Sequence, residues 1–218
     1  MKKGLTELVF ILDRSGSMGG LEEDTIGGFN GMINKQKKEE GSAVVTTVLF
    51  DDKYELLHDR IDIQGILPMN DRQYYVRGCT ALLDAIGMTI EKMINVHKHT
   101  AKEQRAEKVI FTIITDGMEN SSRKYNKSMV KELIQAQKAR GWEFIFLGAN
   151  MDAVEEAASF GIDSDRAVTY QNDREGVELN YEVISEAVSA MRCCSVPIGR
   201  SWKSRIEEDQ AKRGKTGR

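Results

Sequence analysis

The sequence predicts an α/β fold with a doubly wound, mostly parallel sheet and one antiparallel edge strand. Apolar runs of strand length alternate with amphipathic segments of helix length from end to end. Residues 9–12 and 109–115 are nearly continuous apolar runs, which are typical of strands covered by helices on both faces. Only "DDK" separates two further runs, so their connection is too short for a parallel crossover.

The elements of the first half follow in order. After the strand at 9–12, apolar residues at helical spacing predict a helix from Leu21 to Ile33, with lysines just beyond it. Residues 42–50, "SAVVTTVLF", predict a β-branched strand. Residues 54–63 predict its antiparallel partner, and residues 82–94 predict a second helix.

The second half continues the alternation. The strand at 109–115 is followed by a helix at 129–137 and by the strand "EFIFLG" at 143–148. Asp152, with Glu155 three residues later, predicts the start of another helix, and Gly161 predicts its end. A short strand at 167–170 and a helix at 177–191 complete the pattern.

Composition limits the domain organisation. With 218 residues and 40 % hydrophobic content, the chain can bury one sizeable core, and its net charge of −3 gives no reason to expect a nucleic-acid partner. Residues 195–218 differ, because they hold seven Lys or Arg against three Asp or Glu. We expect one domain at 1–194 and a loosely ordered basic tail at 195–218, with a short helix around "WKSRIEEDQAK" and Trp202 as its one candidate anchor.

Cysteines and the first residues point to a reducing compartment. Three cysteines, Cys79, Cys193 and Cys194, are odd in number and show no C-x-x-C spacing, which supports neither a disulfide framework nor a zinc site. The first apolar run is interrupted at Asp13 and Arg14, too early for a signal peptide or a membrane span. We therefore expect a cytoplasmic protein without membrane contact.

Oxygen-bearing side chains follow two of the buried strands. Asp13, Ser15 and Ser17 come after the first strand, Asp116 comes after the strand at 109–115, and Thr80 precedes a helix. Ligands of open α/β sheets bind beyond the carboxyl ends of strands, so these five side chains converge if the two strands are neighbours. A single D-x-S-x-S segment is typical of a capping turn. Three separate loops that supply only oxygen favour a hard cation of the Mg²⁺ type.

These segments resemble a known site. D-x-S-x-S after the first strand, a Thr in a G-x-T-A-L-type segment and T-D-G after a middle strand are similar to the metal-ion-dependent adhesion site of von Willebrand factor A domains, over residues 5 to about 192. The resemblance extends to stand-alone bacterial and phage members, including those associated with tellurite resistance, which the segment "FLGANMDAVEEAASFGI" also fits. Cys79 departs from the pattern, since Gly is common before the Thr.

The resemblance implies a ligand set and a function. Ser15, Ser17 and Thr80 would contact Mg²⁺ or Mn²⁺, and Asp13 and Asp116 would contact it directly or through water. Adhesion-type domains commonly take an Asp or Glu of a protein partner as the final ligand. The implied function is therefore a metal-dependent protein-binding module rather than an enzyme.

Side chains beside the ligands are candidates for a partner-binding rim. Arg14 and Arg77 would favour an acidic partner if they flank the opening, and Met18, Met118 and Glu119 would select which partner fits. The alternative interpretation is that the arginines are ordinary solvated charges and that the methionines serve local packing.

The alternative is a metal-assisted, phosphatase-like hydrolase at the same strand end. Haloacid-dehalogenase-like phosphatases carry D-x-D there, with the second Asp as general acid, whereas this chain has Ser15. Ser17 lacks the G-x-S-x-G elbow of a serine nucleophile, and His58, His97 and His99 fall in an expected edge strand or polar loop. The turn after the first strand also lacks the G-x-G-x-x-G of a dinucleotide site.

Overall fold

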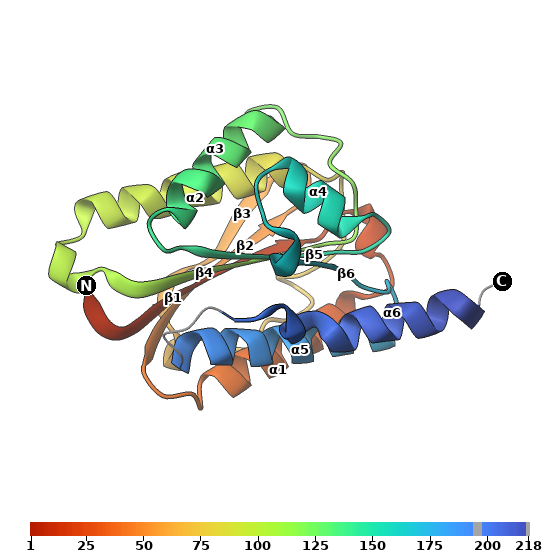
Figure 1. Ribbon diagram of the computed structural model, residues 1–218, viewed down its shortest axis with the longest axis horizontal. Helices are drawn as coiled ribbons and strands as arrows, with labels where there is room; N and C mark the ends of the chain where they lie inside the picture. The colour runs from red at the N-terminus through yellow and green to blue at the C-terminus, as the bar shows by residue number, and fades with distance from the viewer. Residues whose placement is uncertain (194–197, 217–218) are drawn as a thin grey trace.

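A computed structural model describes residues 1–193 and 198–216 and shows one six-stranded sheet (Figure 1). The spatial order of the strands is β3-β2-β1-β4-β5-β6. Their bounds are β1 (Lys2–Asp13), β2 (Ser42–Phe50), β3 (Tyr54–Asp62), β4 (Ala106–Thr115), β5 (Glu143–Gly148) and β6 (Ala167–Thr169).

The pairing of the strands confirms the predicted fold class. β1 lies in the middle and pairs in parallel with β2 on one side and with β4 on the other. β5 and β6 extend the parallel part, and β3 pairs with β2 in the antiparallel sense at one edge. β1 and β4 are therefore neighbours, and the segments that follow them meet at one edge of the sheet.

Helices cover both faces of the sheet. α2, α3 and α4 lie on one face, and α1, α5 and α6 lie on the other (Figure 1). Their bounds are α1 (Glu22–Gln36), α2 (Leu82–His99), α3 (Lys127–Lys138), α4 (Ala153–Ser159), α5 (Arg174–Cys193) and α6 (Ser204–Thr216).

Strand β1 is buried on both faces, as its continuous apolar run predicts. Alternate residues of a strand point to opposite faces. Phe10 joins the core beneath α1 and α5, where its ring meets that of Phe29 edge to face at 5.6 Å between centroids. Ile11 joins the second core, which includes residues of α2, α3 and α4. β1 therefore holds Asp13 at the junction of the two cores.

The predicted ends of α4 are also confirmed. The Asp152 side chain accepts hydrogen bonds from the backbone N–H groups of Val154 and Glu155. Gly161, just past the helix, has φ of +93°, a conformation that side chains other than glycine rarely adopt. β1, in contrast, begins seven residues earlier than the apolar run, because Lys2 already pairs with Ala106.

The expectation of a loosely ordered C-terminal tail is wrong for residues 200–216, whereas the short helix and the Trp202 anchor expected within it are confirmed. The chain makes a 3-10 turn, η5 (Arg200–Lys203), and then α6, which packs on α5 and β6. Lys203 is 1 % exposed and donates to the carbonyls of Ser164 and Ala167, both at 2.7 Å. Ile206 joins the core, and Trp202 donates to the carbonyl of Asp165. The expected boundary at residue 194 lies outside the described residues.

Two of the three cysteines fall within the described residues. Cys79 and Cys193 are both exposed, and Cys194 is outside the described range. In the part of the chain that the structure describes, no helix has the length and apolar character that crossing a membrane requires.

Candidate metal centre

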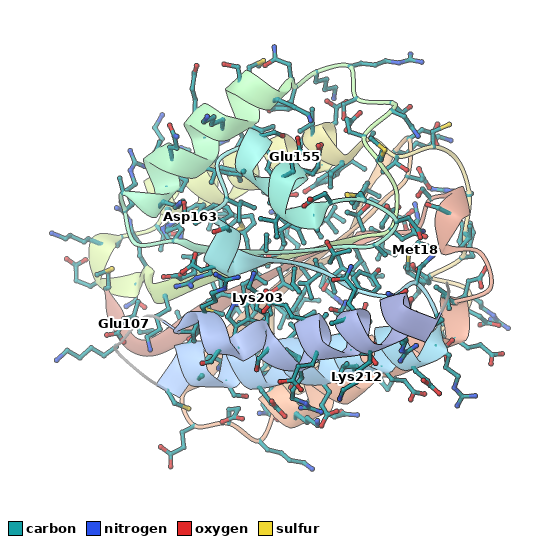
Figure 2. All side chains as sticks on the ribbon, turned by 45° about the vertical axis from the view of Figure 1, so that its right-hand side comes forward. Met18, Glu107, Glu155, Asp163, Lys203 and Lys212 are labelled. Carbon is teal, nitrogen blue, oxygen red and sulfur yellow. The ribbon has the colours of Figure 1, made fainter. Side chains whose placement is uncertain are left out.

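The predicted site residues meet at the carboxyl ends of β1 and β4. Asp13 ends β1, and the loop after it makes the short turn η1 (Gly16–Met18) that carries Ser17. Asp116 follows β4 directly, and Thr80 stands in the segment that leads into α2. In Figure 2, Met18 marks this end of the molecule.

Four of the five side chains form one connected chain of oxygens. Thr80 Oγ1 donates to Ser15 Oγ at 3.0 Å, and Ser15 Oγ lies 3.1 Å from Ser17 Oγ. Ser17 Oγ donates to Asp116 Oδ1 at 2.6 Å. These contacts cross sequence separations of 65 and 99 residues, which local capping does not require. The predicted convergence is therefore confirmed.

Asp13 lies behind this chain of oxygens. Its Oδ1 accepts from the backbone N–H of Ser15 at 2.7 Å, and its Oδ2 accepts from the hydroxyl of Thr115. Its backbone carbonyl accepts from the Tyr74 hydroxyl, and Tyr74 is itself buried. One carboxylate oxygen is thus oriented by the loop after β1 and the other by β4. Asp13 is tied to the loop that carries the serines.

The two carboxylates lie in an environment that disfavours their charge. Burial raises the pKa of Asp13 to about 6, and the nearby charge of Asp116 adds to the effect, although the hydrogen bonds from Thr115 and Ser15 oppose it. Burial also raises the pKa of Asp116, against hydrogen bonds from Ser17 and Asn172. Within residues 1–193 and 198–216, no Lys, Arg or His forms an ion pair with either. The negative charge of the two carboxylates is therefore not balanced by a cationic side chain of the described residues.

Gly117 keeps the space between the loops open. A Cβ at this position would lie 2.7 Å from Thr80 Oγ1, 3.0 Å from Ser17 Oγ and 3.6 Å from Ser15 Oγ. A side chain here would therefore occupy the space on which the three hydroxyls face. This small, oxygen-lined cradle fits a cation better than it fits any larger group.

A second glycine shapes the loop before Thr80. Gly78 has φ of +69°, and a Cβ there would lie 2.4 Å from Asp52 Oδ1. Its carbonyl accepts from the N–H of Gly16, which ties this loop to the serine loop. Cys79, where the sequence departs from the resembled pattern, is exposed and leaves Thr80 in place.

Three polar residues that sequence reasoning missed hold the ligand candidates. Asn172, after β6, donates to Asp116 Oδ2 at 3.0 Å. Asn120 accepts from the backbone N–H of Thr80, and Thr115 donates to Asp13. Thr115 is the first residue of the T-D-G segment and Asn120 lies three residues after that segment, so a search in and around the motif could have found them. No local pattern marks Asn172.

Two members of the expected rim are buried, so that part of the prediction is wrong. Arg14 is 0 % exposed because it turns away from the opening to Asp51 and Glu55, with contacts of 3.1 and 2.7 Å. Met18 is 2 % exposed and packs inside the molecule. Neither side chain can meet a partner on the surface.

The other three rim candidates reach the surface to different degrees. Met118 is 66 % exposed beside the site. Arg77 is half-buried and pairs with Asp51, while its Nη1 donates to the Tyr75 hydroxyl. Glu119 has an internal role, because its carboxylate accepts from the backbone N–H of Leu83, at the start of α2, and from groups of its own loop. Met118 and Arg77 thus remain available to a partner.

The donor set has few charged members. The described residues contain no group of three or more His, Cys, Asp or Glu side chains placed to hold a metal ion. The cluster above instead combines two carboxylates with three hydroxyls. Such a set can hold a hard divalent cation with oxygen ligands and retained water, as Mg²⁺ sites do.

Comparisons with known proteins identify similar folds among solved structures. No protein-family model and no curated protein sequence matches the chain. Among solved structures, the von Willebrand factor domain of the type V pili tip protein Mfa5 from Porphyromonas gingivalis aligns with a TM-score of 0.63 at 11 % identity, over 88 % of this chain and 98 % of that one.

Two longer proteins contain a similar domain. Proximal thread matrix protein 1 from the mussel byssus, with a zinc-occupied metal-ion-dependent adhesion site, aligns with a TM-score of 0.57 at 14 % identity over 84 % of this chain and 46 % of that one. The ArnB paralog VWA2 from Sulfolobus acidocaldarius gives 0.54 at 19 % identity over 86 % and 45 %. This chain spans less than half of either protein. It shares the α/β, Rossmann-like fold of von Willebrand factor A domains.

Proposed function

We propose that this chain is a protein-binding module that holds a divalent cation at the carboxyl ends of β1 and β4 and uses it to bind an acidic residue of a partner. The observation that carries the proposal is the connected set of Ser15, Ser17, Thr80 and Asp116 oxygens beside buried Asp13. Three loops supply these groups, and Gly117 leaves the space between them open.

The residues present fit Mg²⁺ or Mn²⁺ best. Every donor is oxygen, and no thiol or imidazole lies among the candidates, which favours a hard cation. Ser15, Ser17 and Thr80 would hold it from the surface side, whereas Asp13 and Asp116 would supply the negative charge. When bound, the cation offers a ligand position to an incoming carboxylate. The zinc-occupied site of the mussel byssus protein supports a divalent cation in this fold.

Charge balance favours an acidic partner. Two carboxylates carry at most two negative charges, which only neutralise a divalent ion. The loaded site would therefore have no net negative charge that repels the carboxylate of a partner. Arg77, with a side chain that is 34 % exposed, would offer that carboxylate a charge-assisted hydrogen bond. Met118 at 66 % and Tyr75 at 42 % exposure provide apolar contact area nearby. Arg77 and Met118 are kept from the rim predicted from sequence, and Tyr75 is added to it.

The hydrolase alternative lacks a specific supporting observation. Ser15 stands where a D-x-D phosphatase carries its general acid. Both oxygens of Asp13 accept hydrogen bonds inside the protein, from Ser15 N–H and from Thr115. A carboxylate held in this way is oriented as a structural or metal-linked group. It is poorly placed as a free nucleophile.

Selection of peptide ligands tests the proposal without knowledge of the natural partner. A displayed random peptide library is panned on the protein in millimolar Mg²⁺ or Mn²⁺. Each selected peptide is then measured again with its Asp changed to Asn or its Glu to Gln, with EDTA, and on the Thr80→Ala protein. We expect each change to weaken binding by about tenfold or more, because each removes a link between the protein and the carboxylate.

The same peptide-binding measurements include control variants and outcomes that would contradict the proposal. Arg77→Ala should weaken the peptides by about 1–3 kcal/mol, the range of a hydrogen bond to a charged group, whereas Lys131→Ala on the exposed face of α3 should not. Full binding in EDTA, or by the amide peptides, would contradict the proposal. Turnover of p-nitrophenyl phosphate that requires Mg²⁺ and disappears in Asp13→Asn would favour the hydrolase instead.

A further inference from the structure

A second cavity lies at the opposite end of the sheet from the candidate metal centre. It has a volume of about 620 Å³ and opens between the C-terminal ends of α2 and α3 and the start of β4. Glu107, one of its lining residues, and Met18, beside the metal centre, lie at opposite ends of the molecule (Figure 2). The size falls within the range of small-molecule sites.

Positively charged side chains dominate the rim of this cavity. Lys98, Lys102, Arg105 and Arg140 all line it, and none of them forms an ion pair with any residue in the described ranges 1–193 and 198–216. The single acidic side chain in the lining is Glu107, whose Oε2 already accepts a hydrogen bond from the N–H of Gly4 at 2.7 Å. The rim therefore has an excess of positive charge in a chain whose net charge is −3.

Helix ends explain part of this positive charge. The C-terminal end of a helix favours a cation, which accounts for Lys98 in the last turn of α2 and for Arg140 just beyond α3. Arg105 follows the short turn η3 (Lys102–Gln104) and donates to the carbonyl of Thr100, the C-cap of α2, whereas Lys102, in the turn itself, has no such contact with α2 or α3 among the described residues. Four like charges around one cavity repel one another unless an anion lies between them.

Most of the hydrogen-bonding capacity of the two arginines is unused. Arg105 Nε donates to the carbonyl of Thr100 at 2.9 Å, which fixes the side chain. Arg140 makes one long contact of 3.5 Å to Gln137 Oε1. Each guanidinium has five N–H donors in a planar fork that matches the oxygens of phosphate. The rim can thus donate several charge-assisted hydrogen bonds to an anion.

The inner wall of the cavity is apolar and firmly held. Ile94, Val109 and Trp142 line it. The Trp142 ring is stacked on Phe111 at 5.6 Å between centroids and meets His97 edge to face at 5.2 Å. Trp142 is 6 % exposed and Val109 is 3 % exposed, so both are held in place and present only a small area to the cavity, whereas Ile94 is partly exposed. The wall therefore offers a small, fixed apolar surface to the non-charged part of a ligand.

We propose that this cavity binds a small organic phosphate, with the phosphates on the rim of Lys98, Lys102, Arg105 and Arg140 and an apolar, ring-containing part against Trp142. A compact inorganic anion would fill a small part of 620 Å³ and leave the apolar wall in water. A mononucleotide has the required combination of size, clustered charge and a flat ring. The site is independent of the metal centre.

ADP is the probe that tests the proposal. Binding is measured by isothermal titration calorimetry in EDTA, so that the metal centre plays no part. In parallel, the Trp202→Phe protein leaves Trp142 as its single tryptophan, since the chain has two. We expect ADP to bind and to change the fluorescence of Trp142. We also expect inorganic pyrophosphate and adenosine, which each carry one half of the recognised chemistry, to bind more weakly than ADP.

A matched pair of double variants assigns the site. Lys98→Gln with Lys102→Gln removes two rim charges, whereas Lys53→Gln with Lys131→Gln removes two exposed lysines elsewhere. The first pair should weaken ADP binding by about tenfold or more, and the second by less than about twofold, because charge-assisted hydrogen bonds act only at short range. Arg140→Gln should weaken binding in the same direction as the rim pair.

Several results would overturn the proposal. They are an absence of ADP binding at millimolar concentration, equal weakening by the two double variants, pyrophosphate or adenosine binding as tightly as ADP, and no response of Trp142. A Ser15→Ala, Ser17→Ala protein should bind ADP normally in EDTA. Its failure to do so would place the nucleotide at the metal centre and would also overturn the proposal.

Discussion

Two groups of buried carboxylates lie side by side at the carboxyl edge of the sheet, and they differ in what balances their charge. Asp51, just past β2, faces two arginines, since Arg14 Nε lies 3.1 Å from its Oδ2 and Arg77 Nε lies 2.5 Å from the same atom. Asp13 and Asp116, at the ends of β1 and β4, face hydroxyls and amides and no cation among the described residues.

The pKa values express the same difference. Burial, the largest influence on Asp51, raises its pKa, but the hydrogen bonds from Arg77 and Lys53 and the charge of Arg14 together lower it below the ordinary value. For Asp13, burial wins and the pKa rises to about 6. The charge of one cluster, here called the complete cluster, is therefore balanced by arginines of the described residues. The other, the incomplete cluster, has no such partner there and is where we propose a divalent cation.

The complete cluster also supports the incomplete one. The backbone N–H of Arg77 donates to the carbonyl of Arg14, and the N–H of Ala81 donates to the carbonyl of Asp51. The loop that carries Thr80 is thus fixed at both ends to residues of the ion-paired cluster. Arg14, expected at the rim, instead helps to hold a candidate ligand loop from below.

The largest effect should come from breaking the complete cluster. Asp51→Asn leaves Arg14, which is fully buried, with Glu55 as its remaining acidic partner. We expect a loss of about 3–5 kcal/mol in the free energy of unfolding, the usual result of removing one partner from a buried ion pair. Urea denaturation in EDTA measures this loss at pH 7.

The matched change in the incomplete cluster should behave differently. Asp13→Asn removes a buried charge that has no cationic partner, so in EDTA we expect a change of about 1 kcal/mol or less. A loss as large as that of Asp51→Asn would contradict the comparison.

The pH dependence of the stability of Asp51→Asn provides a further check. The pKa of Asp51 is lowered in the folded protein, so the stabilisation from its charge is present above the unfolded pKa of 3.8 and is lost as the pH falls below that value. The difference in free energy of unfolding between wild type and Asp51→Asn should therefore become smaller below pH 3.8.

An added methyl group should close the incomplete cluster to a cation. In Gly117→Ala, the new Cβ would lie 2.7 Å from Thr80 Oγ1, within the cradle. At a concentration of Mg²⁺ about 100 times its Kd, we expect the variant to lose the whole metal-induced stabilisation of about 2.7 kcal/mol. Gly27→Ala in α1, where a Cβ meets nothing within 4 Å, should keep that increment. Calorimetric unfolding with and without Mg²⁺ compares the two, and a normal metal response in Gly117→Ala would argue against the assigned position.

A smaller effect should follow from loosening one carboxylate. Asn172 donates to Asp116 Oδ2, so Asn172→Ala frees this oxygen without touching a candidate ligand. Groups that orient metal ligands typically contribute about 10–100-fold to metal affinity. We expect a weakening of Mn²⁺ binding near the lower end of that range, measured by electron paramagnetic resonance of free Mn²⁺. Unchanged affinity would mean that Asp116 needs no such support.

Sequence reasoning worked where the physical signal is local or periodic. Continuous apolar runs located the buried C-terminal parts of β1 and β4, because a strand covered on both faces has no polar side there, although both strands begin earlier than the runs. The three-residue connection correctly required the antiparallel edge strand. Once these two strands are neighbours, the convergence of Asp13, Ser15, Ser17, Thr80 and Asp116 follows from topology. The divalent cation itself stays a prediction.

It failed where a side chain is positioned by distant partners. Arg14 is buried because Asp51 and Glu55, some 40 positions later, approach it through strand pairing. Lys203 is buried because two carbonyls near β6 accept its protons, so a basic, weakly apolar segment docks as a helix. Asn172, after β6, reaches Asp116, after β4, across the end of the intervening strand β5. No short pattern encodes these contacts.

The most direct measurement is the thermal unfolding of wild type and of Ser15→Ala, Ser17→Ala during titration with MgCl₂ or MnCl₂. Wild type should rise in melting temperature in a saturable way, and the double variant should show no rise, because it lacks two of the cradle's oxygens. Ser42→Ala with Ser128→Ala, at two exposed positions, is the matched control and should respond as wild type does. A full metal-induced rise in the Ser15→Ala, Ser17→Ala protein would contradict the claim that these loops hold a divalent cation.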